Sequence, residues 1–272
     1  MKKLLLSLSI IILIAKGALA QSHGHLYIGA TNTAQGTPLI FDNASDYSTN
    51  TGYIKTLTYT NGAQYAGYYQ GNITLTGLAA TAAFSGPELN AAALGSQLWA
   101  QIVSVEGPAG GAFGFWEVNA TTPTISLACG TTGTNAFKVT QTAGAPGDDP
   151  FGHIHGRRFT ATKPGSYLVG FRALDRTTNG INSGPIHTPS EVLKFYFQAG
   201  INIAAISRTN GMADVTFGSA IGQTFYLEYS TDLSSDIWTT LGSVAGNDAL
   251  QILSDPAANS ISRFYHIKVT TP

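Results

Sequence analysis

Cysteine and charge are both scarce in this sequence of 272 residues. Its single cysteine, Cys129, cannot form a disulfide within the chain, so the fold depends on packing, or on packing together with a metal ion. Charged residues make up 11% of the chain, and the formal net charge is −1. This balance argues against a basic face for nucleic acid or for an anionic lipid surface, and we predict neither as a partner.

Long apolar runs are missing after the N-terminus, which itself has the three parts of a cleavable secretory signal over 1–20. Lys2 and Lys3 form the positive start, an apolar stretch follows, and Ala18-Leu19-Ala20 forms a small-x-small cleavage site. The apolar stretch is too short to cross a bilayer, which needs ~20 residues. We predict cleavage after Ala20, no transmembrane segment in the mature chain, and a secreted, periplasmic or cell-surface location.

Glycine is abundant, with 31 residues, and short alternating runs bounded by Gly, Asn, Pro or Thr recur along the chain. Tyr167, Val169 and Phe171 illustrate the period of two, because alternate residues of a strand share one face. Runs of this kind are typical of β-sandwiches, and the pattern restarts near residue 200. We therefore predict an all-β protein with a β-sandwich domain over 21–199 and a smaller Ig- or fibronectin-like sandwich over 200–272.

Four of the six histidines form two His-x-His pairs, His23 with His25 and His153 with His155. In an extended chain, residues i and i+2 point to the same face with Cα atoms ~6.6–6.8 Å apart. Two such imidazoles can converge on one ion, and Ile154 between the second pair would point into the core. Two pairs, with His187 as a further candidate, match the ligand number of tetrahedral zinc or tetragonal copper. We predict that these five histidines hold zinc or, alternatively, copper.

Other interpretations of the polar motifs stay open. Histidines near a strand end are often inert, and Asp148 and Asp149 before the second pair fit a polar turn as well as carboxylate ligands or a general base. The sequence has no Gly-x-Ser-x-Gly elbow, His-Glu-x-x-His helix or phosphate loop. A metal-dependent enzyme would need an open coordination position and an acid or base beside it, so we expect a non-enzymatic protein.

The second histidine pair opens a longer pattern. Three motifs follow one another along the chain: Gly152-His153-Ile154-His155, Arg158-Phe159-Thr160, and Lys163-Pro164-Gly165-Ser166-Tyr167. Their order resembles the hallmark of the bacterial choice-of-anchor M, or surface-anchored-domain, family, in which His-x-His is followed by an aromatic-Phe-Thr motif and then by Pro-Gly-x-Tyr. Arg158 stands where the family usually has the aromatic residue. The opening His23-Gly24-His25 and the central segment over 107–117 also resemble this family.

The resemblance covers most of 21–200. It implies an extracytoplasmic, β-rich domain linked to zinc or another transition metal in the envelope, because the family includes PEP-CTERM proteins repressed by the zinc-uptake regulator. The segment over 226–233, with Trp238 and Arg263-Phe264-Tyr265, resembles a fibronectin-like C-terminal module of many secreted proteins of Verrucomicrobia and Planctomycetes.

Three functions follow from these observations. The leading hypothesis is an exported, non-enzymatic zinc- or copper-binding protein of the bacterial envelope. The second is a surface adhesion or carbohydrate-binding protein with incidental histidines and a cell-surface or extracellular ligand, for which the tyrosines clustered over 53–69 could stack on sugars or simply pack across strands. The third is a metal-dependent enzyme.

Overall fold

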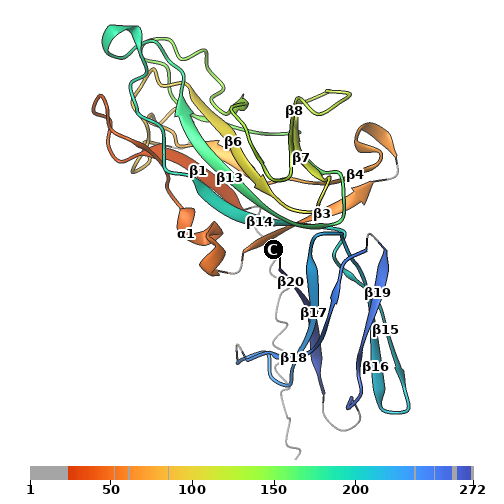
Figure 1. Cartoon of the computed structure of the whole chain (residues 1–272). Coiled ribbons are helices and arrows are strands. Elements are labelled where there is room, and N and C mark those ends of the chain that lie inside the picture. Colours follow the sequence, from red (N-terminus) through yellow and green to blue (C-terminus); the bar gives the residue numbers. More distant parts are fainter. Residues whose placement is uncertain are drawn as a thin grey trace, which may run out of the picture.

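A computed structural model describes residues 24–51, 53–60, 62–84, 86–235, 237–247, 249–258 and 262–270. Almost all of the structure is β, with 48% of residues in strands and 5% in helices, so the prediction of an all-β protein is confirmed. Several sheets form a sandwich- or barrel-like arrangement (Figure 1). The predicted signal peptide, its cleavage site after Ala20 and His23 lie outside the described residues.

The largest sheet has ten strands. Its order is β10 (Ala136–Lys138), β6 (Leu98–Glu106), β13 (Gly165–Asp175), β14 (Leu193–Ala199), β3 (Ile54–Thr60), β4 (Tyr68–Gly71), β12 (Arg158–Ala161), β7 (Ala112–Trp116) and β8 (Ile125–Ala128), with β9 (Thr131–Thr132) paired to β6. The predicted alternation in β13 is confirmed, since Tyr167, Val169 and Phe171 are all fully buried. Aromatic rings fill the space beneath the sheet, with Phe115 and Phe137 stacked at 3.8 Å between centroids.

A four-stranded sheet packs on the same core. Its order is β11 (Gly152–His153), β5 (Thr74–Gly77), β1 (His25–Ala30) and β2 (Leu39–Phe41), and β1 runs parallel to β5 while the other pairs are antiparallel. Leu26, Ile28 and Leu75 point inward and join the hydrophobic core that the ten-stranded sheet also contributes to. The alternate residues of β1 and β5, including His25 and Thr76, therefore face away from that core.

Helical structure is limited to short connections among the described residues. They are α1 (Ala44–Tyr47) and the 3-10 turns Thr49–Thr51, Ala63–Tyr65 and Ile181–Ser183. No helix of the described part of the chain is long and apolar enough to cross a membrane.

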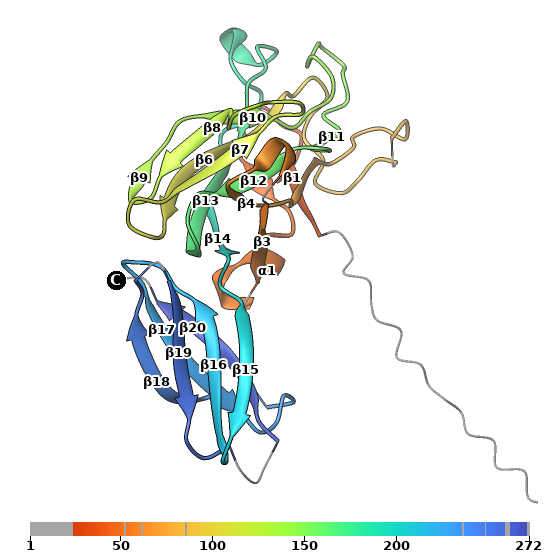
Figure 2. The ribbon, with the colours of Figure 1, turned by 90° about the vertical axis from the view of Figure 1, so that its right-hand side faces the viewer.

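The strands after Gly200 form a lobe of their own below the first group of sheets (Figures 1 and 2). One three-stranded sheet has the order β15 (Ile203–Thr209), β16 (Met212–Gly218) and β19 (Leu250–Asp255), and the other has the order β18 (Thr239–Ala245), β17 (Thr224–Ser230) and β20 (Phe264–Thr270). Phe217 and Phe225 join a second, smaller hydrophobic core between these sheets. The division of the chain into independent domains at residue 200 remains a prediction. An independent domain needs a hydrophobic core of its own, and this smaller core meets that requirement.

A buried glutamine joins the two groups of strands. The Gln223 side chain accepts a hydrogen bond from the Ser166 backbone N–H at 3.0 Å and donates one to the Ser166 carbonyl at 2.7 Å. Gly165 beside it has a φ of +143°, and a Cβ there would lie 2.3 Å from a Pro108 side-chain carbon. The Pro-Gly-x-Tyr motif thus supplies one of the contacts between the first group of strands and the C-terminal lobe.

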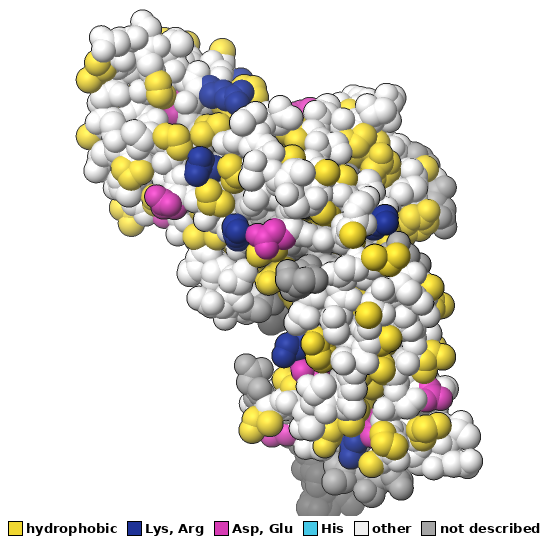
Figure 3. Space-filling model, viewed as in Figure 1, with side chains coloured by type: hydrophobic (Ala, Val, Ile, Leu, Met, Phe, Trp, Pro, Cys, Tyr) yellow, Lys and Arg dark blue, Asp and Glu magenta, His cyan; other side chains and the backbone are white. Residues whose placement is uncertain are grey.

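Charged side chains are sparse on the surface. The view in Figure 3 shows mostly neutral polar groups and backbone, with hydrophobic side chains between them and few charged side chains, some of which lie in adjacent basic and acidic pairs. This matches the low charge content of the sequence.

Candidate metal centre

Strand pairing brings His25 and His153, one from each histidine motif, to one face of the four-stranded sheet. His25 at the start of β1 lies opposite Thr74 of β5, and His153 at the end of β11 lies opposite Thr76 of the same strand. Directly opposite residues project from the same face of a sheet, and so do residues two apart in one strand. His25 and His153 therefore stand on the same face, on either side of β5.

His153 and His155 lie ring against ring. Their centroids are 4.0 Å apart and their planes meet at 84°, in an edge-to-face arrangement. Ile154 between them is fully buried, and its backbone N–H donates to the Leu75 carbonyl at 3.1 Å. The expectation that Ile154 points into the core while its neighbours face outward is confirmed.

Thr76 lies between the two histidine motifs. Its Oγ1 is 2.9 Å from Nδ1 of His25, and its backbone pairs with that of His153. In the tautomer that donates Nδ1–H to this hydroxyl, the lone pair of His25 is on Nε2, which is a common metal-binding atom. A residue that the sequence did not single out thus fixes the orientation of one predicted ligand.

The surroundings of His153 favour its neutral form. Burial lowers the pKa of His153, and the nearby positive charges of His155 and His25 lower that pKa further. The neutral ring is the form that binds a metal ion, because a protonated nitrogen has no lone pair to offer. His153 is therefore biased toward the ligating form at neutral pH.

The described residues do not complete a coordination sphere. Within the described ranges, no three His, Cys, Asp or Glu side chains are arranged so that they could hold a metal ion. His23 precedes this region and lies outside the described residues. The backbone brings His25, His153 and His155 to one end of a sheet, and the rings themselves are not closed around a common point.

His187 has different contacts. It is buried, its Nε2 accepts a hydrogen bond from the Ala93 N–H at 3.0 Å, and its Nδ1 lies 3.2 Å from the Thr37 carbonyl and 3.1 Å from the Thr37 hydroxyl. Burial lowers its pKa, although the Thr37 bond and the charge of Asp175 oppose that shift. Both ring nitrogens are engaged within the fold, so this geometry gives His187 a structural role and we leave it out of the candidate site.

Asp149 holds the loop that leads into the second histidine pair. Its carboxylate accepts hydrogen bonds from the backbone N–H groups of Thr81 at 2.7 Å, Phe151 at 2.8 Å and Ala80 at 3.2 Å. Burial acts to raise the pKa of Asp149, but the hydrogen bonds from Thr81, Phe151 and Ala80 outweigh it and leave the pKa below its usual range. This geometry fits the polar-turn interpretation of the sequence, because the carboxylate is occupied by the backbone.

Other side chains that could take part in metal or sugar binding are also engaged. Glu117 forms an ion pair with Arg157 at 2.7 Å. Burial raises the pKa of Cys129 to about 11, so its sulfur is a protonated thiol at neutral pH and a poor metal ligand. Tyr65 and Tyr68 pack edge-on against Trp116, as expected for side chains that pack across strands.

Comparison with known proteins adds little to this geometry. No protein-family model and no curated protein matches the chain. A solved structure entitled "Cytokine receptor complex - Crystal form 2" aligns with 62% of this chain and 88% of its own, with 10% sequence identity and a TM-score of 0.22. At that score the similarity carries no argument about fold or function.

Proposed function

We propose that the protein is an exported, non-enzymatic transition-metal-binding protein of the bacterial envelope. Its ligands are His25, His153 and His155 together with His23, and its ion is zinc or, alternatively, copper. The role is metal capture outside the cytoplasm, or stabilisation of the fold by the bound ion.

One observation carries this proposal. His25 and His153, one from each His-x-His motif and far apart in the sequence, lie on the two sides of β5 and project from the same face. Unrelated surface histidines have no reason to flank one strand in this way. Imidazole nitrogens suit zinc and copper better than calcium or magnesium, which prefer oxygen.

The environment of the cluster supports the same conclusion. The lowered pKa of His153 favours its neutral form. The Thr76 hydroxyl lies beside Nδ1 of His25, and metal-bound histidines usually have a second hydrogen-bonding partner of this kind. A Cβ at Gly24, the residue before His25, would lie 2.8 Å from the Tyr47 hydroxyl. The backbone directly before His25 is therefore packed close to Tyr47.

Metal content tests the proposal. The chain from residue 21, without an N-terminal tag, is purified with zinc or copper in the medium and its metal is measured by elemental mass spectrometry. We expect bound metal in the wild type and its loss in His153→Ala/His155→Ala. The matched control is His266→Ala, which removes a histidine from the C-terminal lobe and should keep the metal. Equal metal content in the wild type and the double variant would refute the proposed site.

A further inference from the structure

The outer face of the β18–β17–β20 sheet differs from an ordinary solvent-exposed strand surface. In β17, Phe225 and Leu227 are fully buried and point between the two sheets of the lobe. Tyr226 and Glu228 alternate with them and therefore project outward. Their partners across β20 are Lys268 and His266, which lie directly opposite on the same face.

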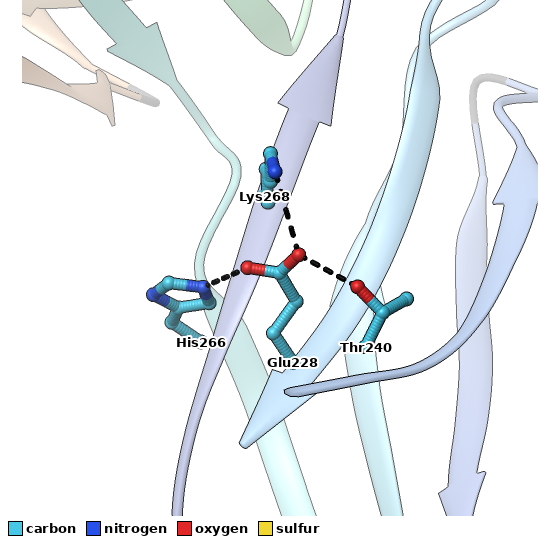
Figure 4. A network of polar contacts seen from close by, with 4 residues as sticks. All are labelled: Glu228, Thr240, His266 and Lys268. Atoms are coloured by element: carbon cyan, nitrogen blue, oxygen red, sulfur yellow. Dashed lines mark hydrogen bonds and ion pairs between the residues drawn. The ribbon is translucent and has the colours of Figure 1, made fainter. Parts of the chain in front are cut away.

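A buried carboxylate organises this face (Figure 4). Glu228 accepts hydrogen bonds from His266 Nε2 at 2.8 Å and from the Thr240 hydroxyl at 2.9 Å, and the Lys268 ammonium lies 3.5 Å from it. Glu228 is buried, whereas the side chains of His266 and Lys268 keep 40% and 58% of their surface exposed. The buried Glu228 carboxylate therefore holds in position two side chains, His266 and Lys268, that solvent can reach.

The charges on this face are balanced. Burial acts to raise the pKa of Glu228, but the hydrogen bonds from His266 and Thr240 and the charge of Lys268 outweigh it and lower the pKa. Glu228 is therefore ionised at neutral pH, and the positive charge of Lys268 offsets it. An ionised carboxylate can only accept hydrogen bonds, so the His266 proton is on Nε2 and Nδ1 faces away from Glu228.

Aromatic residues share this face with the polar group. Trp238 stacks on His266 with centroids 3.8 Å apart and an interplanar angle of 13°. Phe264, two residues before His266, is 42% exposed, and Tyr226 lies opposite Lys268. The outward positions of β17 and β20 thus combine aromatic and polar side chains and include no aliphatic one.

The opposite face of the lobe provides a contrast. There Leu250 and Ile252 of β19 point outward and are 65% and 60% exposed, which gives an aliphatic surface. Aliphatic patches are suited to contact with another apolar protein surface. Aromatic rings beside fixed donors and acceptors suit a ligand that has apolar C–H faces and many hydroxyl groups.

We propose that the outer face of the β18–β17–β20 sheet binds a neutral polysaccharide. Trp238, Tyr226 and Phe264 stack on the C–H faces of the sugar rings, and His266 and Lys268 hydrogen-bond to sugar hydroxyls. Charge balance between Glu228 and Lys268 selects a neutral glycan over an acidic one. This binding site is separate from the proposed metal centre and does not depend on it.

Affinity gel electrophoresis of the full mature chain tests this assignment. Native gels contain one of five neutral polysaccharides: xylan, mannan, β-1,3-glucan, hydroxyethyl cellulose or starch. We expect at least one polysaccharide to retard the wild type, and Trp238→Ala to weaken the retardation by at least ~10-fold. Lys268→Ala, at an exposed position, should weaken binding without affecting the fold, and thermal melts verify that both variants are folded. Leu250→Ser on the opposite face is the matched control and should bind like the wild type.

Three results would overturn the proposal. The first is the absence of retardation of the wild type in all five gels. The second is equal retardation of the wild type and of folded Trp238→Ala and Lys268→Ala variants. The third is self-association in sedimentation experiments that Trp238→Ala abolishes, because the face would then bind a second copy of the chain. Loss of metal in His153→Ala/His155→Ala leaves all three readouts unchanged, so failure here and failure of the metal proposal can be told apart.

Discussion

Among the residues of the loop that precedes the second histidine pair, we expect Asp149 to be the most sensitive to mutation. Its buried carboxylate accepts three backbone N–H bonds, from Thr81, Phe151 and Ala80. In Asp149→Ala these donors lose a charged acceptor, and each buried donor left unpaired costs ~1–3 kcal/mol. Since some of them will reach water, we expect a total loss of ~3–5 kcal/mol in the free energy of unfolding at pH 7.

The same substitution has a defined pH dependence. The folded-state pKa of Asp149 is below its ordinary value. Its contribution to stability is therefore fully present above the unfolded-state pKa of ~3.9 and is lost as the pH falls through the folded-state value. The difference between the wild type and Asp149→Ala should thus be largest near neutral pH and should shrink below about pH 4.

Urea unfolding measured at several pH values tests both statements. The matched control is Asp148→Ala, since the neighbouring carboxylate accepts a backbone hydrogen bond from Ala145 at 2.8 Å and lies nearer the surface. We expect this control to lose at most ~1 kcal/mol. A loss below ~1 kcal/mol in Asp149→Ala, or a loss that does not change with pH, would refute the role assigned to the carboxylate.

Two further predictions concern single contacts. Thr76→Val keeps every proposed ligand but removes the hydroxyl beside His25 Nδ1, so zinc affinity in competition with a chromophoric chelator should fall ~10–100-fold, and unchanged affinity would remove Thr76 from the site. Gln223→Ala removes both hydrogen bonds to the Ser166 backbone at the joint between the lobes. It should cost ~1–3 kcal/mol and accelerate proteolytic cleavage near residue 200, and cleavage at the wild-type rate would show that the lobes are held by other contacts.

The all-β fold class of this protein could be predicted from local sequence patterns. Tyr167, Val169 and Phe171 share the core-facing side of their strand because a strand has a period of two, and their complete burial agrees with that pattern. The outward orientation of His153 and His155 around buried Ile154 is set by the same local rule. Features that depend on this period could therefore be predicted from the sequence.

The features that could not be predicted depend on contacts between distant segments. Thr76 lies beside His25 and opposite His153 because β5 pairs with β1 on one side and β11 on the other, and no local pattern encodes that register. His187 was predicted as a further candidate ligand, but Thr37 and Ala93 take up its ring nitrogens in the interior. Only the fold brings those partners together.

Anomalous diffraction from crystals of the mature chain grown with zinc tests the central claim most directly. The account predicts a peak above the outer face of β5, with Zn–N distances of ~2.0–2.1 Å to imidazoles from both His-x-His pairs. The absence of an anomalous peak near His25, His153 and His155 in crystals grown with zinc would contradict the account. A zinc peak found only at another place on the protein would also contradict it.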